Sequence, residues 1–574
     1  MLVWLVVCIL LLANAARNIA VGQFPDPDDV LRLIQVRDLL AGQGWFDLNQ
    51  HRIDPAGETP MHWSRLVDLP LAIVIAALTP LLGAASAETA GVVLVPLLIM
   101  LATMLLIGRL AWRLFDTETA GFACLAFGFL PLLVFQFQPM RIDHHGWQIF
   151  TVATALYALH FRQARRGGAL AGLAMAAGLL ISLELLPVAA IFGGVLAVRW
   201  LRDNDERPWL IAYLQSLAVS LLALFAITRG FADLTPYCDA ITLPHIGLFA
   251  AVALGVTGLA APHRLSWPLT LAGFAVAATA GLAVFGASSP ECLRTPFGEL
   301  DPLVRDFWYV NVLEGRPLWD QPVLVVPQLF QLSVALVVVV HLGRSSTAWK
   351  RDWWREYLLI FTGTLLLGLL VWRSMAFASV LATIPLGYLL KAAFMKLRRA
   401  RLPKVKLLIV LGLATILIPS VPLLAAMSIA APKTDEGNRI SGPLDRSSCK
   451  LSESSARLAQ LETGVIYAPL DIGPAILQQS PHAVVATGHH RAESAMHDII
   501  AGFLAPPKET HAIMQKHGAR YVVICTDILE PNLYANIGER GSFASRLMAE
   551  DPPDWLQPID LGTPDTFRVW RVVD

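Results

Sequence analysis

Long apolar segments, separated by short polar ones, fill the first three quarters of the chain. A helix needs about 20 mainly apolar residues to cross the hydrocarbon core of a membrane. Fourteen segments reach or approach that length, near residues 2–19, 67–84, 88–110, 118–137, 147–162, 168–183, 184–200, 209–227, 246–262, 266–286, 322–342, 356–372, 373–391 and 406–430. The pattern predicts a mainly α-helical, polytopic membrane protein.

Clusters of Lys and Arg in the short connections indicate the orientation, because these residues favour the cytoplasmic side. They lie at 108–115, 162–168, 263–264, 344–355 and 396–406. If all are cytoplasmic, the segment 67–84 has no room to cross, and we expect it to lie along or dip into the outer leaflet. About thirteen spans remain, with the N-terminus inside and the C-terminus outside.

The first apolar segment allows two interpretations. It is short for a span and lacks a basic start, and "ANAA" resembles a signal-peptidase site. It is either a retained anchor, which we favour, or a cleaved signal, and both place the following residues outside. The predicted outer loops are then 20–87, 138–146 and 287–321.

The composition changes near residue 431. "GVIYAPLDIGPAIL" and "ARYVVICTDI" are typical of strands, whereas "ESSARLAQLE" and "PKETHAIMQKHG" are typical of helices. We therefore predict a transmembrane domain over 1–430 and a small extramembrane α/β domain over 431–574.

Composition agrees with a membrane protein and excludes one class of partner. Only 15% of the 574 residues are charged, against roughly 25% in soluble domains. The formal net charge is zero, which gives no basic field for nucleic acid. The six cysteines form no CxxC motif. Either Cys238 and Cys292 or Cys449 and Cys525 can form a disulfide in an oxidising compartment.

Acidic residues gather directly after the first apolar segment. Asp26, Asp28 and Asp29 precede a helical pattern of apolar residues that continues through Leu39. They can cap that helix and favour its N-terminal dipole. Three carboxylates exceed what one cap requires, so they are also candidates to share a cation.

A second polar group interrupts the apolar pattern at "QPMRIDHHGWQIF". A carboxylate at Asp143 and an imidazole at His145 have the i, i+2 spacing that puts both on one side of an extended loop, as a divalent metal requires. The alternative is a polar loop between two helices. We assign no role to His144.

Two further outer-face residues are candidates. Glu314 lies in "YVNVLEGRPLW", within the loop 287–321. Arg373 lies between two apolar runs, where burial of its charge requires a polar or anionic partner unless it snorkels to the interface. The orientation deduced from the basic connections places all these residues on the same side.

In these residues the chain resembles the catalytic subunit of oligosaccharyltransferases, which have the GT-C membrane fold, and most closely the archaeal and bacterial members. Asp28, nine residues before Arg37, matches the aspartate of the first outer loop, with Asp26 and Asp29 as register alternatives. The archaeal Asp-His-His motif matches at Asp143 and His145, the glutamate of the late outer loop at Glu314, and the donor-phosphate arginine at Arg373. In the tail, Asp471 and Gly473 keep the Asp-x-Gly core of the WWDYG motif, but both tryptophans are missing.

The resemblance implies metal-assisted, inverting transfer of a sugar or oligosaccharide from a polyprenyl-phosphate-type carrier. Asp28, Asp143, His145 and Glu314 are then the metal ligands, with Asp28 and Glu314 also catalytic. A divalent ion such as Mn²⁺ or Mg²⁺ is expected, and the mixed oxygen and nitrogen ligands favour Mn²⁺, Fe²⁺ or Zn²⁺ over Mg²⁺ alone. The substrate contacts expected are Arg373, Asp471, Gly473, His490 and Arg491.

Other functions stay open. The runner-up is a GT-C glycosyltransferase that uses a polyprenyl-monophosphate sugar to modify a lipid or a surface polysaccharide, and the missing tryptophans favour it. A transporter would carry ionisable groups in mid-span, whereas these acids lie in outer loops. A non-catalytic scaffold shares the fold without the activity. The expected partners are a polyprenyl-linked sugar donor, a protein, lipid or polysaccharide acceptor, and membrane lipid. The expected location is a bacterial inner membrane, with the site facing the periplasm.

Overall fold

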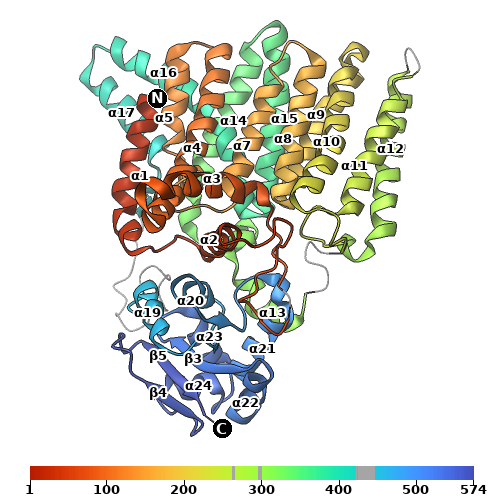
Figure 1. Cartoon of the computed structure of the whole chain (residues 1–574). Helices are drawn as coiled ribbons and strands as arrows, with labels where there is room; N and C mark the ends of the chain where they lie inside the picture. The colour runs from red at the N-terminus through yellow and green to blue at the C-terminus, as the bar shows by residue number, and fades with distance from the viewer. Residues whose placement is uncertain (58, 262–264, 295–299, 422, 425–446, 574) are drawn as a thin grey trace.

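The computed structural model describes residues 1–57, 59–261, 265–294, 300–421, 423–424 and 447–573. Packed helices form one part of the molecule, and a small domain containing a β-sheet lies beyond one end of them (Figure 1). Among the described residues, nine helical segments are long and apolar enough to cross a membrane. The predicted class is therefore confirmed, while the number of thirteen spans stays a prediction.

The helical part follows the apolar pattern closely. Its longer helices are α1 (Leu2–Val21), α2 (Pro27–Leu40), α3 (Arg65–Leu82), α4 (Ala84–Leu114), α5 (Thr117–Phe127), α7 (His145–Ala158), α8 (Ala164–Ile181), α9 (Leu186–Arg202), α10 (Arg207–Thr228), α11 (Leu243–Gly258), α12 (Trp267–Ser288), α14 (Val326–Ser345), α15 (Ala348–Leu370), α16 (Met375–Arg399) and α17 (Pro403–Leu417). Shorter helical pieces include α6 (Pro131–Phe135), α13 (Pro302–Phe307), η1 (Leu183–Leu185), η4 (Tyr309–Asn311), η5 (Leu313–Gly315) and η8 (Trp372–Ser374).

Helix α3 corresponds to the segment expected along the outer leaflet. Gly83 links it to α4, and the side chains of Leu71 and Ile75 approach Gly91 of α4 so closely that a larger residue there would clash. By length and composition α3 also qualifies as a span. Its position in the outer leaflet stays a prediction.

The C-terminal domain is an α/β unit, as the sequence predicted. Its sheet has the order β2-β1-β3-β5-β4, parallel between β2, β1 and β3 and antiparallel between β3, β5 and β4. The strands are β1 (Val465–Tyr467), β2 (Ala483–Val484), β3 (Ala519–Cys525), β4 (Leu556–Ile559) and β5 (Phe567–Val572), and the helices are α19 (Leu451–Arg457), α20 (Gly473–Gln479), α21 (Glu493–Leu504), α22 (Pro507–Lys516), α23 (Leu529–Ile537) and α24 (Phe543–Met548). The proposed boundary at 430/431 lies outside the described residues.

Helix α2 lies between the helical part and the C-terminal domain (Figure 1). Its Arg37 donates a hydrogen bond of 2.8 Å from Nη1 to the carbonyl oxygen of Gln478 at the end of α20. The same guanidinium pairs with Glu88 of α4 at 2.7 Å. One side chain of the first outer loop therefore ties α4 to the C-terminal domain.

Both cysteine pairs named from the sequence form disulfides. Cys238 joins Cys292, and Cys449 joins Cys525. Disulfides persist in oxidising compartments. The bonds therefore agree with an outer location of the loop after α10 and of the C-terminal domain.

Candidate active site

The three aspartates of the first outer loop have three different positions. Asp26 caps α2 by accepting a hydrogen bond from the backbone N–H of Asp28 at 2.9 Å, so the capping interpretation is right for this residue. Asp29 is fully buried and accepts the backbone N–H of Asp143 at 2.8 Å. Asp28 lines a cavity of about 750 Å³. Asp26 lines the same cavity, so these positions disfavour Asp29 and leave Asp28 and Asp26 as the candidates.

Arg141, to which the sequence analysis assigned no role, forms ion pairs with acids of both motifs. Its Nη1 lies 3.0 Å from carboxylate oxygens of both Asp26 and Asp29, and its Nη2 lies 3.4 Å from Asp143. The arginine is buried, so these ion pairs are poorly screened by solvent. The guanidinium positions the second acidic motif against the first.

Asp143, His144 and His145 form a compact buried group at the start of α7. Their possible ligand atoms all lie within 4.8 Å of one another. Both ring nitrogens of His145 are buried without a hydrogen-bond partner, and its Nδ1 is 3.4 Å from Asp143. His144, to which we gave no role, contacts the Asp143 carboxylate and lines the cavity. A carboxylate beside two imidazoles with unpaired nitrogens fits a divalent metal ion.

Asp28 and Glu314 are not members of that compact group, but their charges act on it. Burial, then the charges of Asp26, Asp143 and Glu314, raise the pKa of Asp28 well above its usual range. Burial alone would raise the pKa of Asp143, but His144 and His145 hold it well below the usual range. A bound cation would relieve the repulsion that raises the pKa of Asp28.

Arg373 has the anionic partners that its position required. It pairs with Glu314 of η5 at 3.2 Å and with Glu184 of η1. Burial alone would raise the pKa of Glu314, but Arg373 and then His145 lower it. Glu184 was missed, although a lone acid in the apolar stretch "LLISLELLPV" is the signal that marks a functional residue in a membrane segment.

The C-terminal domain forms the opposite wall of the cavity with Asp471 and His490. Burial, followed by the charge of Asp26, raises the pKa of Asp471 to about 6. His490 Nε2 lies 2.6 Å from Asp239, a residue of the loop after α10. His62, Asp239 and His490 form a second group with metal-ligand spacing.

Two predicted substrate contacts do not line the cavity. Arg491 forms two hydrogen bonds to Asp239, of 2.7 and 2.9 Å, and stacks over Tyr237, so it acts on the cavity through Asp239. Gly473 begins α20 and is buried, and a Cβ atom there would lie 2.8 Å from the carbonyl oxygen of Ala486. Its small size therefore serves close packing.

Comparisons with known proteins support the fold. No protein-family model and no curated protein matches the sequence. The apo oligosaccharyltransferase of Archaeoglobus fulgidus superimposes with a TM-score of 0.67 at 13% identity, covering 91% of this chain and 69% of that one. The same archaeal enzyme in complex with Zn and sulfate has a TM-score of 0.60 at 13% identity, with coverages of 94% and 70%. In complex with an inhibitory peptide and a dolichol-phosphate it also gives 0.60 at 13% identity, with coverages of 89% and 67%.

The chain is therefore a multi-pass membrane protein with the GT-C fold of oligosaccharyltransferases. At this identity the likeness establishes the fold and leaves the activity to the residues of the site.

Proposed function

We propose that the protein is a membrane glycosyltransferase that moves a sugar or oligosaccharide from a polyprenyl-phosphate-type carrier to an acceptor. The observation that carries the proposal is the cavity of about 750 Å³ between the helices and the C-terminal domain. Asp28, Glu314, Arg373, Asp471 and His490 line it, and the Asp143 group lies at the start of α7 beside them. The cavity thus combines carboxylates for the acceptor with a guanidinium for a phosphate.

The residues that line the cavity have different roles in the proposed reaction. Arg373 holds the donor phosphate through charge-assisted hydrogen bonds, in competition with Glu184 and Glu314. Asp28 and Glu314 polarise the acceptor and take its proton. The new bond forms at the anomeric carbon as its bond to the phosphate oxygen breaks, and the electron pair leaves on the phosphate. In-line attack inverts the anomeric configuration.

A divalent metal fits Asp143 and His145, and we propose Asp28 and Glu314 as the ligands that would complete the donor set. Bound there, Mn²⁺, Mg²⁺ or Zn²⁺ would neutralise charge that develops on the leaving phosphate. Asp143 and His145 would hold it, and Arg141 would keep Asp143 in place. Because the His145 imidazole, with both ring nitrogens unpaired, adjoins the carboxylate, the set favours Mn²⁺ or Zn²⁺ over Mg²⁺.

Topology completes the proposal. The basic connections and the two disulfides together support a cavity on the periplasmic side of an inner membrane. A lipid-borne donor would reach it from the outer leaflet. Reporter fusions to the loop after α10 and to the C-terminus would test this orientation, and cytoplasmic signals from either would contradict it.

The test of function is transfer from labelled polyprenyl-phosphate sugars in membrane vesicles. Asp28→Asn, Asp143→Asn and Glu314→Gln should each lower transfer by about 100-fold or more. Asp306→Asn is the matched control, because Asp306 is an exposed acid in the loop 287–321 that also carries Glu314, and it pairs with the exposed Arg305. Wild-type transfer by the Asp143→Asn variant would remove the metal-site assignment.

A second candidate transfers from a polyprenyl-monophosphate sugar to a lipid or polysaccharide. Asp471 lines the cavity without the tryptophans that accompany its counterpart in the peptide-glycosylating family, which favours a non-peptide acceptor. Supplying vesicles with each donor class, together with peptide and lipid acceptors, separates the two. Mass spectrometry of glycoproteins and envelope glycans from a deletion strain would identify the natural acceptor.

A further inference from the structure

A second large cavity, of about 1060 Å³, opens at the other end of the helices. Helix α15 ends beside Arg373 and begins at this cavity, and its 23 residues span about 34 Å. That length matches a hydrocarbon core of about 30 Å. Helices α7 and α9 likewise begin near the candidate active site and end here. The cavity therefore lies at the opposite membrane interface.

Three basic clusters that the proposed reaction does not use meet in this cavity. Two of them contribute arginines, Arg113 from the end of α4 and Arg162 from the connection between α7 and α8, whereas the start of α15 contributes tryptophans and acids. Aromatic side chains complete the wall, among them Phe161, Trp209, Trp349 and Trp353. Segments distant in sequence thus assemble one pocket with charged and aromatic walls.

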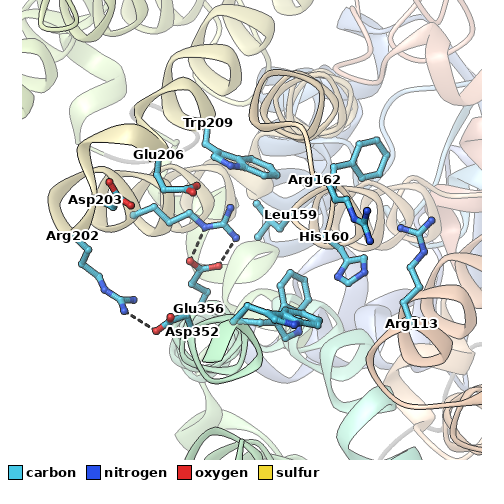
Figure 2. Close-up of a pocket in the computed structure, with 14 residues that line it drawn as sticks. Arg113, Leu159, His160, Arg162, Arg202, Asp203, Glu206, Trp209, Asp352 and Glu356 are labelled. Carbon is cyan, nitrogen blue, oxygen red and sulfur yellow. Dashed lines mark hydrogen bonds and ion pairs between the residues drawn. The ribbon is translucent and has the colours of Figure 1, made fainter. Parts of the chain in front are cut away.

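The charges are divided unevenly across the pocket (Figure 2). On one side Arg199 pairs with Glu356 through two hydrogen bonds, and Arg202 pairs with Asp352 at 2.7 Å. On the other side lie Arg113, Arg162 and His160 (Figure 2). Within the described part of the chain, neither Arg113 nor Arg162 has an ion pair with an acid. The first side also carries Asp203 and Glu206, so its four acids outnumber its two arginines, and only the other half is cationic (Figure 2).

An unsatisfied donor adds an independent observation. Trp353 is only 6% exposed and lines the pocket, yet its indole Nε1–H has no hydrogen-bond partner. Its ring lies 5.7 Å from the ring of His160 on the cationic side. A buried donor without an acceptor costs about 1–3 kcal/mol, so a ligand that supplies an acceptor gains that energy.

We propose that this pocket binds a phosphate-bearing group. Guanidinium groups match phosphate oxygens with charge and geometry, and the Trp353 N–H supplies a further donor. The volume exceeds that of a phosphate and leaves room for the esterified part against the tryptophans. The phosphate comes from an anionic lipid headgroup of the adjacent leaflet or from a soluble phosphate ester. The proposal is independent of the transfer reaction.

Binding of two probes to the delipidated, full-length protein tests the proposal. Phosphatidylglycerol binding is measured by native mass spectrometry, and glycerol 3-phosphate binding by calorimetry. The double variant Arg113→Gln/Arg162→Gln should weaken binding by about tenfold or more, from the loss of two cations near the interface. Arg165→Gln/Arg166→Gln is the matched control, because both arginines are exposed on the first turn of α8 and neither lines the pocket.

The outcomes distinguish a lipid headgroup from a soluble phosphate ester, and two of them would refute the proposal. Binding of phosphatidylglycerol without competition by glycerol 3-phosphate assigns the pocket to a lipid headgroup, and effective competition assigns it to a soluble ester. Trp353→Phe, which keeps an aromatic ring but removes the N–H, should also weaken binding without loss of thermal stability. Equal weakening by the two arginine pairs, or binding of neither probe, would overturn the proposal.

Discussion

Arg141 is the buried cation that three carboxylates of the candidate active site share. We predict that Arg141→Met lowers the free energy of unfolding by about 3–5 kcal/mol, the cost of leaving a buried charge unpaired. The carboxyl that loses its cation is that of Asp29, which is 0% exposed and otherwise accepts only the Asp143 N–H among the hydrogen bonds of the described residues. Burial raises the pKa of Asp29 to about 8 even beside Arg141, so the loss is measured above pH 8, where this carboxyl is ionised. Transfer should fall as well, because Asp143 loses its ion pair with Arg141.

A double variant tests whether the Asp29 carboxylate causes the loss of stability. In Arg141→Met/Asp29→Asn the amide oxygen still accepts the Asp143 N–H, but the unpaired Asp29 carboxylate is gone, so at least about 2 kcal/mol should return. Denaturant titration of the detergent-solubilised protein measures both variants. Arg305→Gln, which removes an exposed arginine of the outer loop, should leave the transition unchanged. If Asp29→Asn restores nothing, the unpaired Asp29 charge is not the cause.

Three further predictions concern stability and the site. Burial raises the pKa of Glu530 to about 8, so the folded protein holds a proton that the unfolded chain releases, and stability should fall as pH rises from about 4.5 to 8; thermal unfolding of Glu530→Gln should show a weaker dependence, with the remainder due to other carboxyls of raised pKa such as Asp471. Replacing Cys449 and Cys525 with Ser reopens a loop with a sequence separation of 76 and should cost about 4 kcal/mol in denaturant titrations. Glu184→Gln removes one competitor for Arg373 and should lower the donor KM several-fold, whereas Glu184→Asp should not.

The membrane helices and the C-terminal α/β domain were predictable because burial in lipid leaves a strong local pattern. The bounds of the helices were less predictable, because they differ from those of the apolar runs. Helix α7, with 14 residues, begins within the polar motif at His145 and ends before the apolar run does. Tertiary packing sets such boundaries, and the local sequence does not.

The candidate site was predictable in its residue types and less so in their roles. Sequence placed Asp28, Asp29 and Asp26 in one cluster, but only the fold shows that Asp29 faces Arg141 and that Asp28 faces the cavity. Asp239 and its partner Arg491 are separated by 252 positions, so no local pattern connects them. A single sequence does not show which distant loops come into contact.

Charge on the cavity wall leads to a last prediction. Its acids outnumber its arginines: the acids are Asp26, Asp28, Glu184, Asp239, Glu314 and Asp471, and the arginines are Arg294 and Arg373. Burial is the first cause of the raised pKa of Asp28 and of Asp471, and repulsion by neighbouring acids raises both further. An anionic phosphate entering this wall should therefore be repelled unless a cation is present.

Binding of undecaprenyl phosphate to the purified protein should accordingly weaken by about tenfold or more when a chelator removes divalent ions. Asp28→Asn should reduce that dependence, because it removes one of the charges that repel the phosphate. Asp306→Asn, at an exposed position in the outer loop, should leave it unchanged. Equal binding by the wild-type protein with and without chelator would show that Arg373 alone suffices for the phosphate, and the cation would then have no part in holding the donor.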